Sequence, residues 1–211
     1  MYAALTVACS LSLCQFSAGL DLKEFNKPEL ARVEQYWSNL QSMFSEIYGS
    51  RLFTVARMNG HSIAGGCVLS MAADYRVSLA GTKVGMTEAA LGMTLPWWIE
   101  RMVRDLVGPR ACERWVTLAL VEDAAVAAQA GFVDAVADGE GALDELVAAE
   151  LKRALKIPSA ARAANKLQTR ADLLGGMISR HDQDVEYFAS MITSPPLQAA
   201  IGAYAASLAK K

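Results

Sequence analysis

The sequence has few residues that could build a metal centre. It holds two histidines and four cysteines among 211 residues, and no two cysteines form a C-x-x-C pair. Zinc sites need clusters of such ligands at short spacing, so we predict no metal site. Sparse cysteines in a chain large enough to build its own core are typical of reduced, buried thiols in an intracellular compartment. We therefore assign no chemistry to Cys9, Cys14, Cys67 and Cys112.

An excess of charge of either sign is also lacking. The 20 Lys and Arg residues against 22 Asp and Glu give a net charge of −2, and the basic residues are not clustered. Nucleic-acid binding needs a basic patch facing the phosphates, so we predict no nucleic-acid partner. The 53% hydrophobic content supplies a sizeable core, excludes global disorder and favours a large subunit interface. The length fits one domain, or one domain with a small C-terminal appendage.

Residues 1–20 carry no charge at all, which raises the question of a signal peptide or a membrane span. The stretch lacks a basic start, and polar residues such as Thr6 and Ser10 interrupt it. It also leads directly into a glycine-containing segment described below. We therefore predict a buried strand followed by a loop, and no membrane span.

Strands and helices alternate in the first two thirds of the sequence, and helices alone follow. Apolar residues spaced by three and four predict helices, and short runs rich in β-forming residues predict strands. The expected helices cover 28–48, 67–73, 97–106, 109–120 and 123–129, and the expected strands cover 51–58, 74–79, 81–86 and 132–136. From residue 143 onward we expect only helices. The pattern predicts an α/β core over residues 1–140 and a C-terminal helical region over residues 141–211.

Several common motifs of nucleotide-binding and hydrolytic enzymes are missing. The sequence contains neither G-x-x-x-x-G-K-[ST], nor G-x-G-x-x-G, nor G-x-S-x-G, so kinase, dehydrogenase and serine-hydrolase hypotheses lose their main support. Three segments punctuated by glycine remain: FSAGLDLKE at 16–24, NGHSIAGG at 59–66 and VGMTEAALG at 84–92.

These three segments, in this order and spacing, resemble the enoyl-CoA hydratase/isomerase (crotonase) superfamily, and most of all its mitochondrial Δ3,Δ2-enoyl-CoA isomerases. The resemblance runs from about Phe16 to the C-terminus and continues through LGMTLPWWIERM, GPRACERW and AGFVDAV. It implies a spiral of ββα units, a C-terminal helical region that forms trimers, and acyl-CoA thioesters as substrates. It further implies a homotrimer or a dimer of trimers, the mitochondrial matrix as location, and no cofactor beyond the coenzyme A of the substrate.

By the same resemblance, Ala18 and Gly65 occupy the two oxyanion-hole positions. An enolate beside a thioester needs two donors aimed at its oxygen, and a backbone N–H in such a position supplies about 2.7–4 kcal/mol. Gly65 also begins a short helix, whose N-terminus favours negative charge. Taken alone, each of these segments is better explained by a tight turn and close packing.

The resemblance places the catalytic glutamate at Glu88. Its neighbours Met86, Ala89, Ala90 and Leu91 are apolar, and an apolar environment raises the pKa of a carboxyl group and makes it a better proton acceptor once ionised. Local sequence alone also permits a helix-capping glutamate beside Thr87. The match to the family favours catalysis.

Hydratases of the family use a second glutamate, at the position that is Val68 here. Valine cannot orient water or exchange a proton, whereas moving a double bond from C3–C4 to C2–C3 needs one carboxylate only. The pair of Val68 and Glu88 therefore favours an isomerase over a hydratase. A catalytically silent acyl-CoA-binding or structural relative is the other alternative, because only fifteen residues precede Phe16 and a ββα unit of the family is expected to be missing from this sequence.

Further substrate contacts follow from the resemblance. They are assigned to Ser17, Gly19, Leu20, Asp21, Ile63, Ala64, Val68, Leu91 and Trp97. For Trp97, ordinary core packing at the start of a helix is the alternative.

Overall fold

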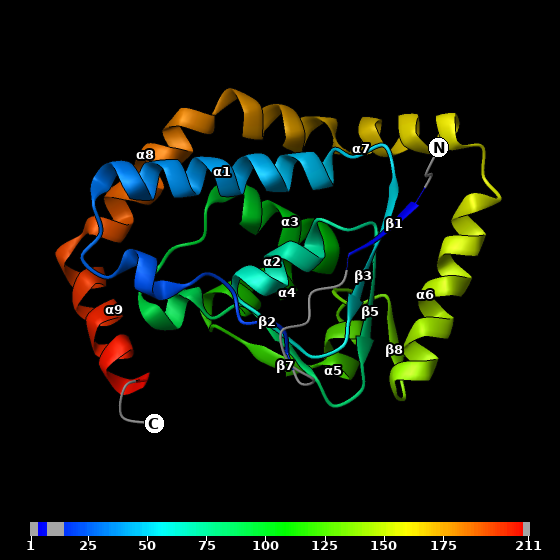
Figure 1. Cartoon of the computed structure of the whole chain (residues 1–211), viewed down its shortest axis with the longest axis horizontal. Coiled ribbons are helices and arrows are strands. Elements are labelled where there is room, and N and C mark those ends of the chain that lie inside the picture. The colour runs from blue at the N-terminus through cyan, green and yellow to red at the C-terminus, as the bar shows by residue number, and fades with distance from the viewer. Residues whose placement is uncertain (1–3, 8–14, 209–211) are drawn as a thin grey trace.

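The computed structural model describes residues 4–7 and 15–208. Strands and helices alternate as far as residue 137, and only helices follow (Figure 1). The strands are β1 (Ala4–Val7), β2 (Gln15–Ser17), β3 (Phe53–Met58), β4 (His61–Ile63), β5 (Tyr75–Leu79), β6 (Lys83–Gly85), β7 (Val121–Asp123) and β8 (Ala135–Ala137). The helices are α1 (Leu30–Tyr48), α2 (Gly65–Met71), α3 (Trp97–Val107), α4 (Pro109–Thr117), α5 (Ala124–Gln129), α6 (Glu140–Leu155), α7 (Ser159–Ser179), α8 (His181–Thr193) and α9 (Pro195–Leu208), with short 3-10 helices η1 (Leu22–Phe25) and η2 (Glu88–Leu91).

From β1 to β6, consecutive strands in the described residues belong alternately to two different sheets. One sheet has the order β1-β3-β5-β8 and is parallel throughout, and the other has the order β2-β4-β6-β7 with only β7 antiparallel. Each of the pairs β1/β2, β3/β4 and β5/β6 thus adds one strand to each sheet before the chain continues into a helix, and β7 and β8, separated by α5, complete the two sheets. The predicted ββα spiral with a C-terminal helical region is confirmed.

The first sheet is covered by α6, which lies along one side of the molecule (Figure 1). Val55 and Val77 of the sheet pack against Leu143 and Val147 of the helix. Such all-parallel sheets need apolar cover on both faces. The predicted boundary between residues 140 and 141 coincides with the start of α6, but the helix belongs to the same core as the sheet.

Helix α1 packs along α7 and α8 (Figure 1). Its buried residues Val33, Trp37, Gln41 and Phe44 recur every three or four positions, as the sequence pattern predicts. The C-terminal helices complete this packing, because Phe188, Ile192, Leu197 and Ile201 are also buried within the chain. The buried faces of α8 and α9 thus pack on the core of their own chain.

A buried ion-pair network joins α7 to the first sheet. The Asp74 carboxylate accepts hydrogen bonds from the Thr54 amide at 2.7 Å and from Lys166 Nζ at 2.8 Å, and it pairs with Arg170 at 2.9 Å. Nearby, Arg76 pairs with Asp134 at 2.6 Å. The carboxylates compensate the cations that folding removes from water, which is the condition for keeping such charges inside.

The short strands are where the sequence-based expectations differ from the structure. Strands β4 and β7 were not predicted, and residues 121–123, next to the predicted helix 109–120, pair with β6 instead. Three residues are too few to show a period of two, so tertiary pairing alone defines these strands. The expected N-terminal strand corresponds to β1 and β2, which lie in different sheets. Among the described residues, no helix is both long and apolar enough to cross a membrane.

Candidate active site

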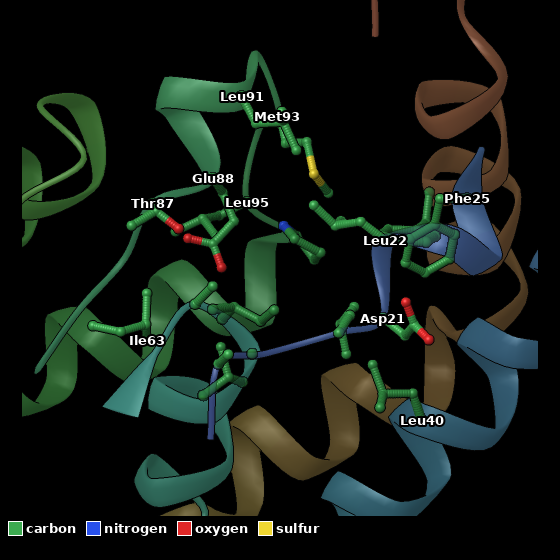
Figure 2. A pocket seen from close by; sticks show the side chains of 18 of the residues that line it. Asp21, Leu22, Phe25, Leu40, Ile63, Thr87, Glu88, Leu91, Met93 and Leu95 are labelled. Carbon is green, nitrogen blue, oxygen red and sulfur yellow. The ribbon is translucent and has the colours of Figure 1, made fainter. Parts of the chain in front are cut away.

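A cavity of about 900 Å³ opens between the second sheet, α1, α2, α3 and the C-terminal helices. Its polar lining comes from Gln15, Asp21, Lys23, Thr87, Glu88, Thr94 and Tyr204, and the rest is mostly aliphatic and aromatic. Figure 2 shows Glu88 on one side of this space, with Leu22, Phe25 and Leu40 on the opposite side. The cavity is thus an apolar space with few polar groups, as is typical of small-molecule sites.

Two backbone amides reach the cavity from different turns of the spiral. Ala18 follows the last residue of β2, and Gly65 is the first residue of α2. An amide in the first turn of a helix has no acceptor inside that helix. Among the described residues, neither amide donates a hydrogen bond to another backbone or side-chain group. Both line the cavity, so two free N–H donors are available there.

Close backbone contact holds the two amides together. A Cβ atom on Gly66 would lie 2.3 Å from the Ser17 carbonyl oxygen, and one on Gly19 would lie 2.9 Å from the Gly65 nitrogen. Gly19 also has a φ of +98°, which other residues rarely adopt. Glycine is therefore required at both positions, and the segment after β2 rests directly on the first turn of α2.

Ala64 carries backbone strain immediately before the Gly65 amide. Its φ and ψ are 52° and −124°, a conformation that costs a non-glycine residue about 1–3 kcal/mol. Its own amide donates a 2.8 Å hydrogen bond to the Gly85 carbonyl of β6. The neighbouring strand thus holds the turn that aims Gly65 into the cavity.

Glu88 supplies the carboxyl group of the site. It begins η2, three residues after the end of β6, and Figure 2 shows its side chain directed into the cavity. Its Oε2 atom is buried without a hydrogen-bond partner among the described residues. Burial raises the pKa of Glu88, and hydrogen bonding to the backbone of Glu88 and Thr87 lowers it by less. With its carboxyl group in an apolar space and no cation paired with it in the part of the chain described, Glu88 has the properties of a proton-transfer group.

An apolar side chain, Val68, occupies the position that was predicted to carry the second glutamate in a hydratase. Val68 lines the cavity from the second turn of α2 and is 2% exposed. Its neighbour Cys67 is completely buried, and burial raises the pKa of that thiol well above its ordinary value. Burial likewise raises the pKa of Cys112 to about 11. Both thiols therefore stay protonated at neutral pH.

The cavity collects most of the residues that the sequence assigned to the site. Ala18, Leu20, Asp21, Ile63, Ala64, Gly65, Val68, Glu88 and Leu91 all line it. Ser17 and Gly19 lie just behind the lining, where they form the backbone contact with α2. In the described residues, no group of three or more His, Cys, Asp or Glu side chains is arranged to bind a metal ion.

Trp97 does not line this cavity. Its ring lies against Gly176 of α7 and under the Arg180 guanidinium, 4.8 Å from the ring centre. The structure thus does not bring Trp97 to the other predicted site residues: it packs α3 against the C-terminal helices, which is the alternative that the sequence left open. The tryptophan that does line the cavity is Trp37 of α1.

Sequence reasoning missed the opposite side of the cavity. Leu22 and Phe25 of η1 and Leu40 of α1 lie on that side (Figure 2), and Phe44 of α1 and Phe188 of α8 also line the cavity. The helical periodicity of residues 28–48 marked Leu40 and Phe44 as buried, but nothing in the local pattern separates a core residue from a cavity residue.

A ββα spiral that carries two free amides and a buried carboxylate at one cavity defines a crotonase-type enzyme. Residues 10–209 match the sequence model of the enoyl-CoA hydratase/isomerase family. The chain therefore belongs to this family, and the membership supports an enzyme with a crotonase-type reaction on an enoyl-CoA.

Individual relatives agree with this assignment. The chain is 32% identical to "Enoyl-CoA delta isomerase 1, mitochondrial" of Mus musculus, over 93% of this chain and 68% of the relative. The Homo sapiens protein of the same name is also 32% identical, over 90% of this chain and 63% of the relative. The chain thus spans about two thirds of the length of these curated relatives.

Solved structures show the same fold. The crystal structure of human mitochondrial delta3-delta2-enoyl-CoA isomerase superposes with a TM-score of 0.93 at 30% identity, covering 98% of this chain and 80% of that one. An enoyl-CoA hydratase from Bacillus halodurans superposes with a TM-score of 0.85 at 19% identity, covering 94% of this chain and 81% of that one, which shows the fold alone.

The buried Glu88 carboxyl predicts a pH-dependent cost to stability. Because its pKa in the folded state is raised, this cost is absent when both folded and unfolded states are protonated, and it appears as the pH rises through the folded-state pKa. We expect Glu88→Gln to raise the midpoint of urea unfolding at pH 7.5, with the gain vanishing below about pH 4, under the ordinary pKa of glutamate.

The matched control is Glu113→Gln, which removes an exposed carboxylate in an i,i+3 pair with Arg110. It should leave the midpoint unchanged or slightly lower at pH 7.5. An equal gain for Glu88→Gln at both pH values would contradict the assigned burial of the carboxylate.

Proposed function

We propose that this protein is a Δ3,Δ2-enoyl-CoA isomerase, which converts 3-enoyl-CoA to 2-trans-enoyl-CoA in fatty-acid β-oxidation. The observation that carries the proposal is one buried carboxylate, Glu88, on the same cavity as the free amides of Ala18 and Gly65, with Val68 where a second acid would stand. The identity to isomerases from two mammals supports it. On the same basis we propose the mitochondrial matrix as its location.

The proposed reaction needs one proton acceptor and two donors. The thioester oxygen accepts hydrogen bonds from the Ala18 and Gly65 amides, which stabilise the negative charge that develops there. The Glu88 carboxylate removes a proton from C2, and the electrons of that C–H bond form the enolate. When the enolate collapses, C4 takes the proton back from Glu88 and the double bond lies between C2 and C3.

The environment of Glu88 suits both transfers. A carboxyl group with a raised pKa accepts a proton from carbon more readily than an ordinary glutamate and still returns it in the next step. The apolar lining excludes water that would compete for the proton. Because both steps use one residue of the chain, we propose that no cofactor takes part beyond the coenzyme A of the substrate.

The first test of the mechanism is Glu88→Gln, which keeps the shape of the side chain but cannot accept the proton. We expect turnover of 3-hexenoyl-CoA to fall by about 10²–10⁴-fold while acyl-CoA binding persists. For the unmodified protein, kcat/KM should rise with pH through the raised pKa of Glu88 and then level off, because only the ionised base is active. Absorbance of the conjugated 2-enoyl thioester measures the rate. Retention of more than about a tenth of the rate would remove Glu88 from this role.

The second test separates isomerase from hydratase, the first alternative within the family. Since Val68 cannot hold water, hydration of crotonyl-CoA should be very slow beside isomerisation of 3-hexenoyl-CoA. Comparable rates for the two substrates would favour the hydratase. The variant Val68→Glu should introduce some hydration if it folds, and circular dichroism checks that the new buried carboxyl has not unfolded α2.

The third prediction concerns assembly, because we also propose a homotrimer or a dimer of trimers. Large apolar side chains remain exposed on and near the C-terminal helices, with Leu155, Ile157 and Ile178 at 55%, 51% and 73% exposure. Light scattering at micromolar concentration should give three or six times the mass of the 22.6 kDa chain. A monomeric mass would contradict the proposal.

A further inference from the structure

Four aromatic side chains line the cavity and are called the aromatic wall here: Phe25, Trp37, Phe44 and Phe188. These rings come from η1, α1 and α8, and each is at most 2% exposed. Figure 2 shows Phe25 and Leu40 across the cavity from the Glu88 carboxyl. Part of the wall, at Phe25, thus faces Glu88 across the cavity.

The rings of the aromatic wall are fixed against one another. Trp37 and Phe188 stack with ring centres 3.6 Å apart and an angle of 7° between planes. Phe25 contacts the edge of Phe188 at 5.7 Å, and Phe44 contacts Trp98 behind the wall at 5.4 Å. The last two pairs lie at distances where aromatic contacts contribute beyond the area they bury.

Asp184 holds the Trp37 ring by its polar edge. Its Oδ2 atom accepts hydrogen bonds from Trp37 Nε1 at 2.8 Å and from Trp98 Nε1 at 3.0 Å. Asp184 lies one helical turn before Phe188 on α8, so one helix face contacts both the plane and the N–H of the same indole. The residue is 4% exposed, and in the described part of the chain it forms no ion pair.

Burying the Asp184 carboxylate with only two neutral donors has a desolvation cost that an apolar core residue would not have. Burial raises the pKa of Asp184, and the two indole hydrogen bonds lower it by less. The arrangement does, however, prevent Trp37 from rotating, because both the ring face and the N–H are fixed.

We propose that Asp184 is a positioning residue that fixes Trp37 as the rigid end of the acyl cavity and so limits the length of the acyl chain. The inference rests on the proposed function, since it takes the occupant of the cavity to be an acyl-CoA. A rigid wall rejects a chain that is too long, whereas a mobile indole would move aside and admit additional methylene groups.

The test compares acyl-chain lengths across four variants. Asp184→Leu removes the acceptor, Trp37→Phe removes the donor but keeps a ring against Phe188, and Asp184→Asn keeps an oxygen that accepts both hydrogen bonds. Asp182→Asn is the matched control, since this aspartate lies on the same helix with its side chain fully exposed. For each, kcat/KM is measured with 3-enoyl-CoA of six, ten and fourteen carbons.

We expect the ratio of kcat/KM for the fourteen-carbon substrate to kcat/KM for the six-carbon substrate to rise at least tenfold in Asp184→Leu and in Trp37→Phe. Each methylene that newly enters an apolar cavity strengthens binding by about fourfold, so a few methylenes suffice. Asp184→Asn should restore the ratio of the unmodified protein, and Asp182→Asn should leave it unchanged. Trp37→Phe keeps the test decisive if Asp184→Leu does not fold, as judged by circular dichroism.

Binding of saturated acyl-CoA of the same lengths, measured by calorimetry, separates this inference from the proposed reaction. A protein that binds with the expected length limit but does not isomerise would contradict the proposed function alone. Turnover with an unchanged length ratio in both Asp184→Leu and Trp37→Phe would overturn the inference alone. A tenfold change in Asp182→Asn, or no acyl-CoA binding at all, would also overturn it.

Discussion

The site depends on one close approach between two stretches of backbone. The segment after β2 lies so near the first turn of α2 that a Cβ on Gly66 would come within 2.3 Å of the Ser17 carbonyl oxygen. No side chain can separate these stretches, so the Ala18 and Gly65 amides are held at one cavity although 46 residues of chain lie between them. The orientation of α2, and with it the place of Val68, follows from this contact.

The apolar environment that buries Glu88 also strengthens the hydrogen bonds that the two amides can donate. Two free N–H groups stabilise an oxygen anion, and they do so most strongly where water is excluded. The same exclusion raises the pKa of Glu88 and leaves its Oε2 without a partner among the described residues. One environment therefore supplies both the donors and the proton acceptor, at a cost in stability that a catalytic group commonly imposes.

The cavity also brings together helices that lie far apart in the sequence. Its aromatic wall combines Trp37 of α1 with Phe188 of α8, and Asp184 links α8 to Trp37 across 147 positions of sequence. The C-terminal helices thus cover the core of their own chain and complete the cavity. This explains why they do not form a separate unit, although the sequence marks them by a change to purely helical character.

Local sequence determined the long helices and the alternation of strands and helices, because periodicity is a local property of the chain. The residues Ala18, Gly65 and Glu88 followed from the resemblance of three glycine-containing segments to a family, since each segment alone also fits a turn or a cap. Tertiary structure decided the rest. The strands β4 and β7 are too short to show a period and exist through pairing with β6. Trp97 packs against α7, while Trp37 reaches the cavity, because burial alone does not say which space an apolar side chain faces. The double hydrogen bond of Asp184 likewise exists only once distant helices have packed together.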